Sequence, residues 1–170
     1  MSYFVAPLAK LIDEFNKLPG IGKKSAQRLA FHILSKDFSY VKNFSDILLE
    51  VKEKVCYCEK CYNITDKNIC DICGSEKRDK DIICVVESPK DVIAMENLNE
   101  FNGVYHVLHG VISPLNEIGP DDIKLKELVD RVTKGNIKEI ILATNLNVEG
   151  ETTAMYIYKL LSPFCDNITR

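Results

Sequence analysis

Four cysteines in two C-x-x-C pairs constrain this chain more than any other feature of its sequence. Cys58 and Cys61 form the first pair, Cys70 and Cys73 form the second, and eight residues separate the pairs. Four thiolates at this spacing can close a tetrahedron around one Zn2+. A disulfide pair or four buried thiols are the alternatives, but disulfides are rare in a reducing compartment and buried thiols need no such pairing. Because sulfur fills all four positions, the pattern predicts one structural zinc with no open site for catalysis.

The charge of the chain changes at this cysteine array. Residues 1–54 carry nine Lys and Arg against six Asp and Glu, residues 55–80 carry five of each, and residues 81–170 carry eight against fourteen. This asymmetry favours binding of a polyanion by the N-terminal part, with the acidic part facing metal or basic protein partners. No apolar run approaches the ~20 residues of a membrane span, and the N-terminus lacks a signal-peptide pattern. We therefore expect a cytoplasmic protein that makes no membrane contact.

Apolar residues at helical spacing predict three amphipathic helices before the array, and we expect the three to pack against one another. Pro19 ends the first helix, and glycines follow it at a tight reversal, which is the pattern of a helix-hairpin-helix. Such a turn lets backbone N–H groups approach a phosphate, while basic side chains at the start of the second helix supply charge. An ordinary helical hairpin with solvated lysines is the alternative. The candidate DNA-binding residues are Gly20, Gly22, Lys23, Lys24 and Arg28.

After the array, apolar strands alternate with helices. This order implies a mostly parallel sheet covered by helices, with ligands expected at the carboxyl ends of the strands. The segment between the two cysteine pairs is too short for an independent fold and is expected to form a β-hairpin. The predicted strands are 82–86, 104–108 and 140–143, and the predicted helices are 90–98, 121–133 and 151–161.

Two acidic residues, Glu87 and Glu149, are predicted near strand ends, where carboxylates could hold Mg2+. Asn145 and Asn147 lie in the same turn as Glu149 and are neutral, so the sequence offers few carboxylates for a catalytic two-metal centre. Glu87 could equally cap the helix that follows it. The sequence leaves open whether this possible acidic site holds Mg2+.

Five segments of the chain carry a resemblance: Leu18–Gly22 with Lys24–Ala30, the cysteine array, Cys84–Val92, Ser113–Leu115 with Ile118–Pro120, and Ala143–Asn145 with Glu149–Glu151. Taken together, they resemble the RecR family of bacterial recombination-repair proteins. The resemblance implies an α+β chain of three parts: a helix-hairpin-helix unit at 1–54, a four-cysteine zinc knuckle at 55–80 and a Toprim α/β domain at 81–170. Asn145 and Asn147 stand where catalytic members of the Toprim superfamily carry aspartates.

The resemblance implies a non-enzymatic clamp or adaptor that binds single- and double-stranded DNA without sequence specificity. Its implied partners are RecO, RecF and further copies of itself, as a dimer or tetramer, and its implied role is to help load RecA on single-stranded DNA. Lys24 and Arg28 match DNA-contacting positions of the family, whereas Lys23 stands where many members have proline and His109 where many have glycine.

The chain ends before a C-terminal segment that takes part in the family's subunit contacts, so we expect dimerisation through the N-terminal helices. Two functions of other classes stay open beside the adaptor. One is a Toprim-type, metal-dependent nuclease that uses Glu87 and Glu149. The other is a zinc module that binds only proteins.

Overall fold

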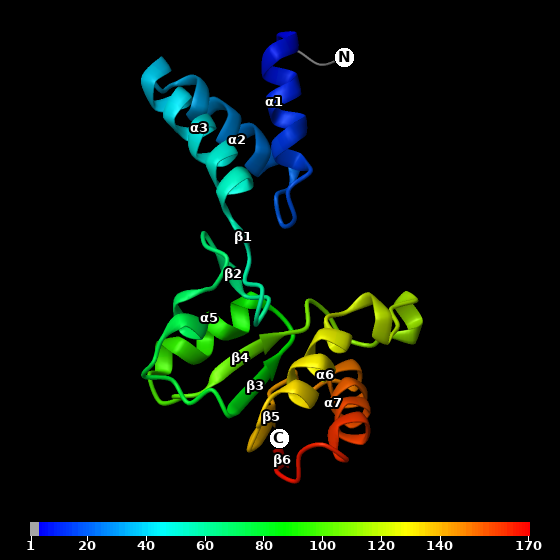
Figure 1. The fold of residues 1–170 in the computed structure, drawn as a ribbon. Helices are drawn as coiled ribbons and strands as arrows, with labels where there is room; N and C mark the ends of the chain where they lie inside the picture. Colours follow the sequence, from blue (N-terminus) through cyan, green and yellow to red (C-terminus); the bar gives the residue numbers. More distant parts are fainter. Residues whose placement is uncertain (1–3) are drawn as a thin grey trace. The chain divides into compact units, whose positions relative to one another are not determined.

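The computed structural model describes residues 4–170, and the chain divides into two compact units, one ending at Lys54 and the other running from Val55 to Arg170 (Figure 1). Within the described part, no helix combines the length and the apolar character that crossing a membrane requires.

The N-terminal unit is helical, with α1 (Ala6–Asn16), α2 (Lys23–Leu34) and α3 (Phe38–Lys54). Helices α1 and α2 pack against each other around Ile12, Ala26 and Ala30. The two alanines on α2 are fully buried, and their small side chains allow the helix backbones to approach closely.

The expected packing of all three N-terminal helices was wrong for α3, which has no buried residue along its whole described length. Its apolar stripe exists, but it faces outward. The periodicity identified an amphipathic helix, yet it carries no information about which surface covers the apolar face. Exposed side chains of this stripe include Tyr40, Phe44, Ile47, Leu48 and Val51.

The C-terminal unit begins with the cysteine array. Strand β1 (Cys56–Tyr57) pairs antiparallel with β2 (Ile64–Thr65). The single turn α4 (Asp71–Gly74) contains Cys73 and has Cys70 as its N-cap. The predicted hairpin between the two pairs is therefore wrong, because the observed hairpin encloses the first pair. The physical reason is local: the Cys58 N–H donates to the Asn63 carbonyl at 2.8 Å, which closes the turn around Cys58 and Cys61. We call the turn formed by residues 58–62 the first knuckle.

A four-stranded, all-parallel sheet follows in the order β4-β3-β5-β6, which confirms the predicted mostly parallel sheet. The sequence analysis did not anticipate β6, whose two residues pair with β5. The strands are β3 (Ile82–Val86), β4 (Val104–Val107), β5 (Glu139–Leu142) and β6 (Ile168–Thr169), and the helices are α5 (Pro89–Leu98), α6 (Leu125–Lys134) and α7 (Val148–Leu161).

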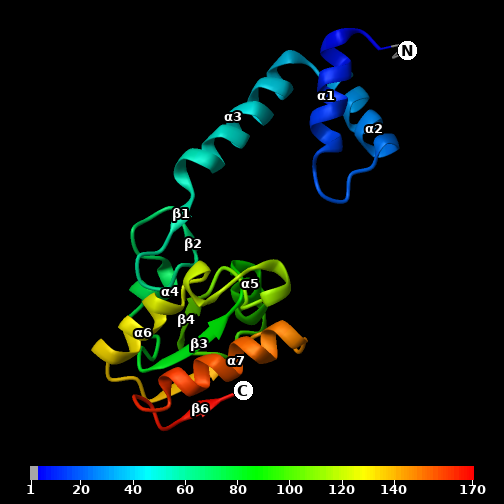
Figure 2. The same ribbon diagram turned by 90° about the vertical axis from the view of Figure 1, so that its right-hand side faces the viewer.

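Strand β3 is covered on both faces, which explains its uninterrupted apolar sequence. Ile83 and Val85 join the core beneath α6 and α7. Cys84 and Val86 point to the other face, where α5 and part of the cysteine array cover them. Figures 1 and 2 show α5 on one side of the sheet and the α6–α7 pair on the other.

Two helices begin at positions other than those predicted. Asp122 does not start α6. Instead, its carboxylate accepts from the Gly119 N–H at 2.7 Å and closes a separate 3-10 turn, η2 (Pro120–Asp122). Helix α7 begins before Glu151, because the Asn147 side chain accepts from the Gly150 N–H at 2.8 Å and serves as the N-cap. The capping residues were visible in the sequence, but their partners were not.

Candidate metal centre and nucleic-acid interface

The four array cysteines converge into one buried cluster. The sulfur atoms of Cys58, Cys61, Cys70 and Cys73 all lie within 4.8 Å of one another. A tetrahedral zinc site with bonds of about 2.3 Å places its sulfurs about 3.8 Å apart, so the cluster fits this metal. Among the residues that the structure describes, this is the one group of three or more His, Cys, Asp or Glu side chains that could hold a metal ion.

Backbone N–H groups and neighbouring thiols set the electrostatics of this cluster. The Cys70 N–H donates to the Cys58 sulfur at 3.3 Å, and the Cys73 N–H donates to the Cys70 sulfur at 3.5 Å. Cys61 and Cys70 share a further hydrogen bond between their sulfurs, which raises the pKa of Cys61 and lowers the pKa of Cys70. A cysteine binds a metal ion as its thiolate, so loading this cluster with a divalent cation would release protons.

Hydrogen bonds hold the first knuckle against the rest of the C-terminal unit. Three successive knuckle carbonyls, those of Lys60, Cys61 and Tyr62, act as acceptors. The Val107 N–H of β4 donates to the Cys61 carbonyl at 2.8 Å, and Nε2 of the His109 ring donates to the Tyr62 carbonyl at 2.7 Å.

Arg131 of α6 supplies the third of these contacts and joins the knuckle to the sheet. Its Nη1 donates to the Lys60 carbonyl at 3.4 Å and to the Tyr105 carbonyl of β4 at 2.6 Å. Sequence reasoning missed the contacts of Arg131 and His109, because their partners are distant in sequence. His109 has a φ of 59°, in the left-handed region that favours glycine.

The turn between α1 and α2 is open around both of its candidate glycines. Gly20 has a φ of +79°, a conformation that glycine adopts without strain, and the turn closes through the Ile21 N–H and the Leu18 carbonyl at 3.1 Å. A side chain added at Gly20 or Gly22 would meet no atom within 4 Å. Gly22 is the N-cap of α2 and provides no side-chain cap, so the first N–H groups of α2 remain accessible to a ligand.

The three candidate cations lie on the first turns of α2. Lys23, Lys24 and Arg28 are all exposed, and none of them forms an ion pair with any residue from 4 to 170. Lys24 and Arg28 are four residues apart and therefore share a helix face. No acidic residue stands in the first turn of α2. The structure thus gathers all five predicted DNA-binding residues around one turn and one helix N-terminus.

The candidate acidic site lies at the carboxyl edge of the sheet, where β3 and β5 are neighbours. Both oxygens of Glu87 accept from Asn145: Oε1 from the backbone N–H at 2.7 Å and Oε2 from the side-chain amide at 2.6 Å. Glu87 does not cap α5, because the N-cap of this helix is Ser88, whose backbone N–H donates to the Asp91 carboxylate at 2.7 Å. Within residues 4–170, Glu87 and Glu149 are not joined by a third His, Cys, Asp or Glu into a metal-binding group.

Arg170 supports the same turn after β5, which sequence reasoning also missed. Its Nη1 donates to the Thr144 hydroxyl at 2.7 Å, its Nη2 donates to the Asn145 carbonyl at 3.4 Å, and its Nε donates to Glu151 at 3.1 Å. The loop that presents Asn145 to Glu87 is therefore held by a cation of the chain itself.

Comparisons with known proteins agree with this arrangement. The chain matches a RecR helix-hairpin-helix family model at residues 8–52, a RecR four-cysteine zinc finger domain model at residues 55–75 and a Toprim domain model at residues 81–167. It is 53% identical over 176 residues to the recombination protein RecR of Chloroherpeton thalassium (strain ATCC 35110 / GB-78), an alignment that covers 100% of this chain and 86% of that relative. The resemblance seen in the sequence is confirmed, and the chain belongs to the RecR family of recombination proteins.

Proposed function

We propose that the protein is a non-enzymatic, cytoplasmic DNA-binding adaptor of recombinational repair, which acts with RecO and RecF to help load RecA on single-stranded DNA. The observation that carries the DNA-binding part is the α1–α2 turn, where a helix N-terminus without a side-chain cap lies beside three exposed cations. Family membership supports the recombination role.

The chemistry of this turn suits a phosphodiester backbone. Accessible N–H groups at the start of α2 can donate to phosphate oxygens, and the helix dipole adds about half a positive charge at this end. Lys23, Lys24 and Arg28 add flexible charges that neutralise further phosphates. Contacts of this kind go to the phosphates, which carry no sequence information, so we propose that binding is independent of sequence and covers both single and double strands.

A binding assay tests this proposal. We expect a Lys24→Ala/Arg28→Ala variant to bind fluorescent single- and double-stranded oligonucleotides more weakly, by about tenfold or more at moderate salt, and equally so for unrelated base sequences. A Lys42→Ala/Lys52→Ala variant removes the same charge from exposed positions on α3 and serves as the control. If the Lys24→Ala/Arg28→Ala variant binds DNA with unchanged affinity, the α1–α2 turn is not the DNA-binding site.

We propose that the cysteine cluster holds one structural zinc ion. Cys58, Cys61, Cys70 and Cys73 would hold this ion, which would link the two C-x-x-C turns. Its role in the adaptor is to hold the first knuckle in the shape whose carbonyls accept from Val107, His109 and Arg131. We take residues 1–54, 55–80 and 81–170 as the three functional parts: DNA-binding head, zinc knuckle and Toprim body.

The proposal assigns no catalytic role to Glu87 and Glu149. Both oxygens of Glu87 already accept hydrogen bonds from Asn145, which supports a structural role for this carboxylate. The test is to incubate labelled DNA with the protein and Mg2+ or Mn2+. Cleavage that disappears in a Glu87→Gln variant would replace the adaptor by the Toprim-type nuclease.

Self-association is the remaining part of the proposal, and the outward-facing stripe of α3 supports it. We propose that a second copy covers this stripe in a dimer, which can in turn form one half of a tetramer. Mass measurement by light scattering should give at least twice the chain mass of 19.3 kDa. An Ile47→Asp/Leu48→Asp variant should be monomeric, whereas a monomeric wild-type protein would contradict this assignment.

A further inference from the structure

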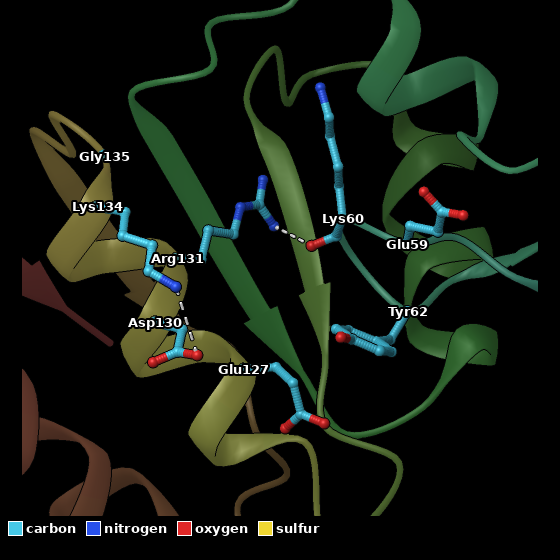
Figure 3. A pocket seen from close by; sticks show the side chains of 8 residues that line it. All are labelled: Glu59, Lys60, Tyr62, Glu127, Asp130, Arg131, Lys134 and Gly135. Carbon is cyan, nitrogen blue, oxygen red and sulfur yellow. Dashed lines mark hydrogen bonds and ion pairs between the residues drawn. The ribbon is translucent and has the colours of Figure 1, made fainter.

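A cleft of about 620 Å3 lies within the C-terminal unit, between the first knuckle and α6 (Figure 3). Tyr62 projects from the knuckle toward α6, and Glu127 lies below its ring in the view of Figure 3. The α6 wall consists of residues three and four positions apart, so one face of this helix lines the cleft. This wall is formed by Glu127, Asp130, Arg131 and Lys134.

A cation of the chain itself lies over the ring of Tyr62, one of the residues that line the cleft. The Lys124 ammonium lies 5.2 Å from the centre of the Tyr62 ring and 2.8 Å from a carboxylate oxygen of Glu127. An ammonium between an aromatic ring and a carboxylate is an arrangement by which proteins bind cationic groups. The Lys124 side chain is 41% exposed, so it can move into solvent without disturbing the core.

The other cations that line the cleft either have partners of their own or point away from Tyr62. Arg131 donates to two backbone carbonyls, and the Lys134 ammonium lies 3.7 Å from Asp130. Lys60 extends its ammonium away from Tyr62 and Glu127 (Figure 3). Once Lys124 moves aside, the Glu127 carboxylate beside Tyr62 is left without its partner, in a unit with thirteen Lys and Arg against nineteen Asp and Glu. The net negative charge of this unit favours a cation over a phosphate at this position.

We propose that the cleft binds an arginine or lysine side chain from a basic segment of a partner protein. The incoming cation takes the place of Lys124 over the Tyr62 ring and pairs with Glu127 and Asp130. A guanidinium suits the site best, because its planar face stacks on an aromatic ring while its edge donates to a carboxylate. The cleft and the α1–α2 turn lie in different units, so failure of this proposal leaves the proposed DNA binding untouched.

Peptide binding to the zinc-loaded full chain tests the site. The probe is a fluorescent, end-blocked peptide of alternating arginine and serine, compared at low ionic strength with the same peptide carrying glutamine for arginine. A Glu127→Gln/Asp130→Asn variant should bind the arginine peptide about threefold to tenfold more weakly. A Glu100→Gln/Asp166→Asn variant removes the same charge from exposed positions outside the cleft and should change binding less than about twofold.

Two lysine variants separate the cleft from general electrostatics. The Lys124→Ala variant removes the ammonium that lies over the Tyr62 ring and should tighten peptide binding about threefold. Lys126→Ala removes an exposed charge from the same helix and serves as the control, so the effect of Lys124→Ala should exceed it. Amide NMR shifts upon peptide addition should concentrate at residues 59–62 and 124–135.

Equal effects of the two double variants, or of the two lysine variants, would overturn the proposal. So would peptide-induced shifts confined to other surfaces. If an oligonucleotide rather than the peptide shifts the cleft resonances, a nucleic acid is the occupant and the proposal is also overturned. Circular dichroism and zinc content of each variant establish that it folds.

Discussion

Replacing Gly150 with alanine should destabilise the C-terminal unit, although helix propensity alone predicts the opposite. Gly150 lies in the first turn of α7, where alanine is favoured over glycine by about 0.5–1 kcal/mol. A Cβ at this position, however, would lie 2.1 Å from the Asn145 carbonyl oxygen and 2.9 Å from side-chain oxygens of both Asn147 and Glu87. The turn must therefore move away from α7.

This movement would strain the contacts that define the carboxyl edge of the sheet. Overpacking costs about 1–3 kcal/mol, and loss of the Asn147 cap costs about 1 kcal/mol more. These terms exceed the gain in propensity, so we expect a net loss of about 1–3 kcal/mol in the free energy of unfolding. The expected loss of stability is this large because the Asn145 oxygen belongs to the backbone and cannot rotate away from the added Cβ, as a flexible side chain could.

Urea denaturation of the zinc-loaded protein, followed by far-UV circular dichroism, measures this loss. Gly119→Ala is the matched control, because a Cβ there would meet its first neighbour, an Asp122 carboxylate oxygen, at 3.6 Å. It should stay within about 0.5 kcal/mol of the wild type. A Gly150→Ala protein as stable as the wild type, or more stable, would refute the reasoning from close contact.

Two further predictions concern the metal and a buried histidine. The Cys70→Ser variant should retain less zinc in competition with a chromogenic chelator. Its Val107 amide, which donates to the Cys61 carbonyl, should also exchange its hydrogen faster. Unchanged zinc content and unchanged exchange would contradict the structural role of the cluster. Burial lowers the pKa of His106 to about 4 in the folded protein, whereas its pKa in the unfolded chain is near 6.5. Between these two pH values the unfolded chain binds one proton more at this residue than the folded protein does. Stability should therefore fall by roughly 1 kcal/mol per pH unit on acidification through this window, and His106→Gln should reduce the slope; equal slopes would show that His106 does not titrate this way.

The sequence predicted those features whose cause is local. The cysteine spacing predicted a cluster that the fold assembles, and the apolar run at 82–86 predicted a buried strand with the observed bounds. The glycines at 20 and 22 predicted the reversal between α1 and α2, because a φ of +79° at Gly20 strongly favours glycine. In each case, the residues that form the pattern are close in sequence and form the structure themselves.

Features that depend on distant partners could not be read from the chain. The α3 stripe was recognised, but not that it faces outward. Glu87 was considered as a helix cap or a metal ligand, whereas its partner is Asn145, 58 positions away. Arg131 and His109 carried no local signal for their contacts with the first knuckle, since only the pairing of β4 with the sheet brings those carbonyls near them.

The salt dependence of DNA binding tests the central claim most directly. The logarithm of affinity for a duplex should fall linearly with the logarithm of salt concentration, and the Lys24→Ala/Arg28→Ala variant should flatten that slope by about 2, since each lost phosphate contact contributes about 0.9. The Lys42→Ala/Lys52→Ala control should keep the wild-type slope. Equal slopes for the wild type and the Lys24→Ala/Arg28→Ala variant would contradict the assignment of the α1–α2 turn as the DNA-binding site.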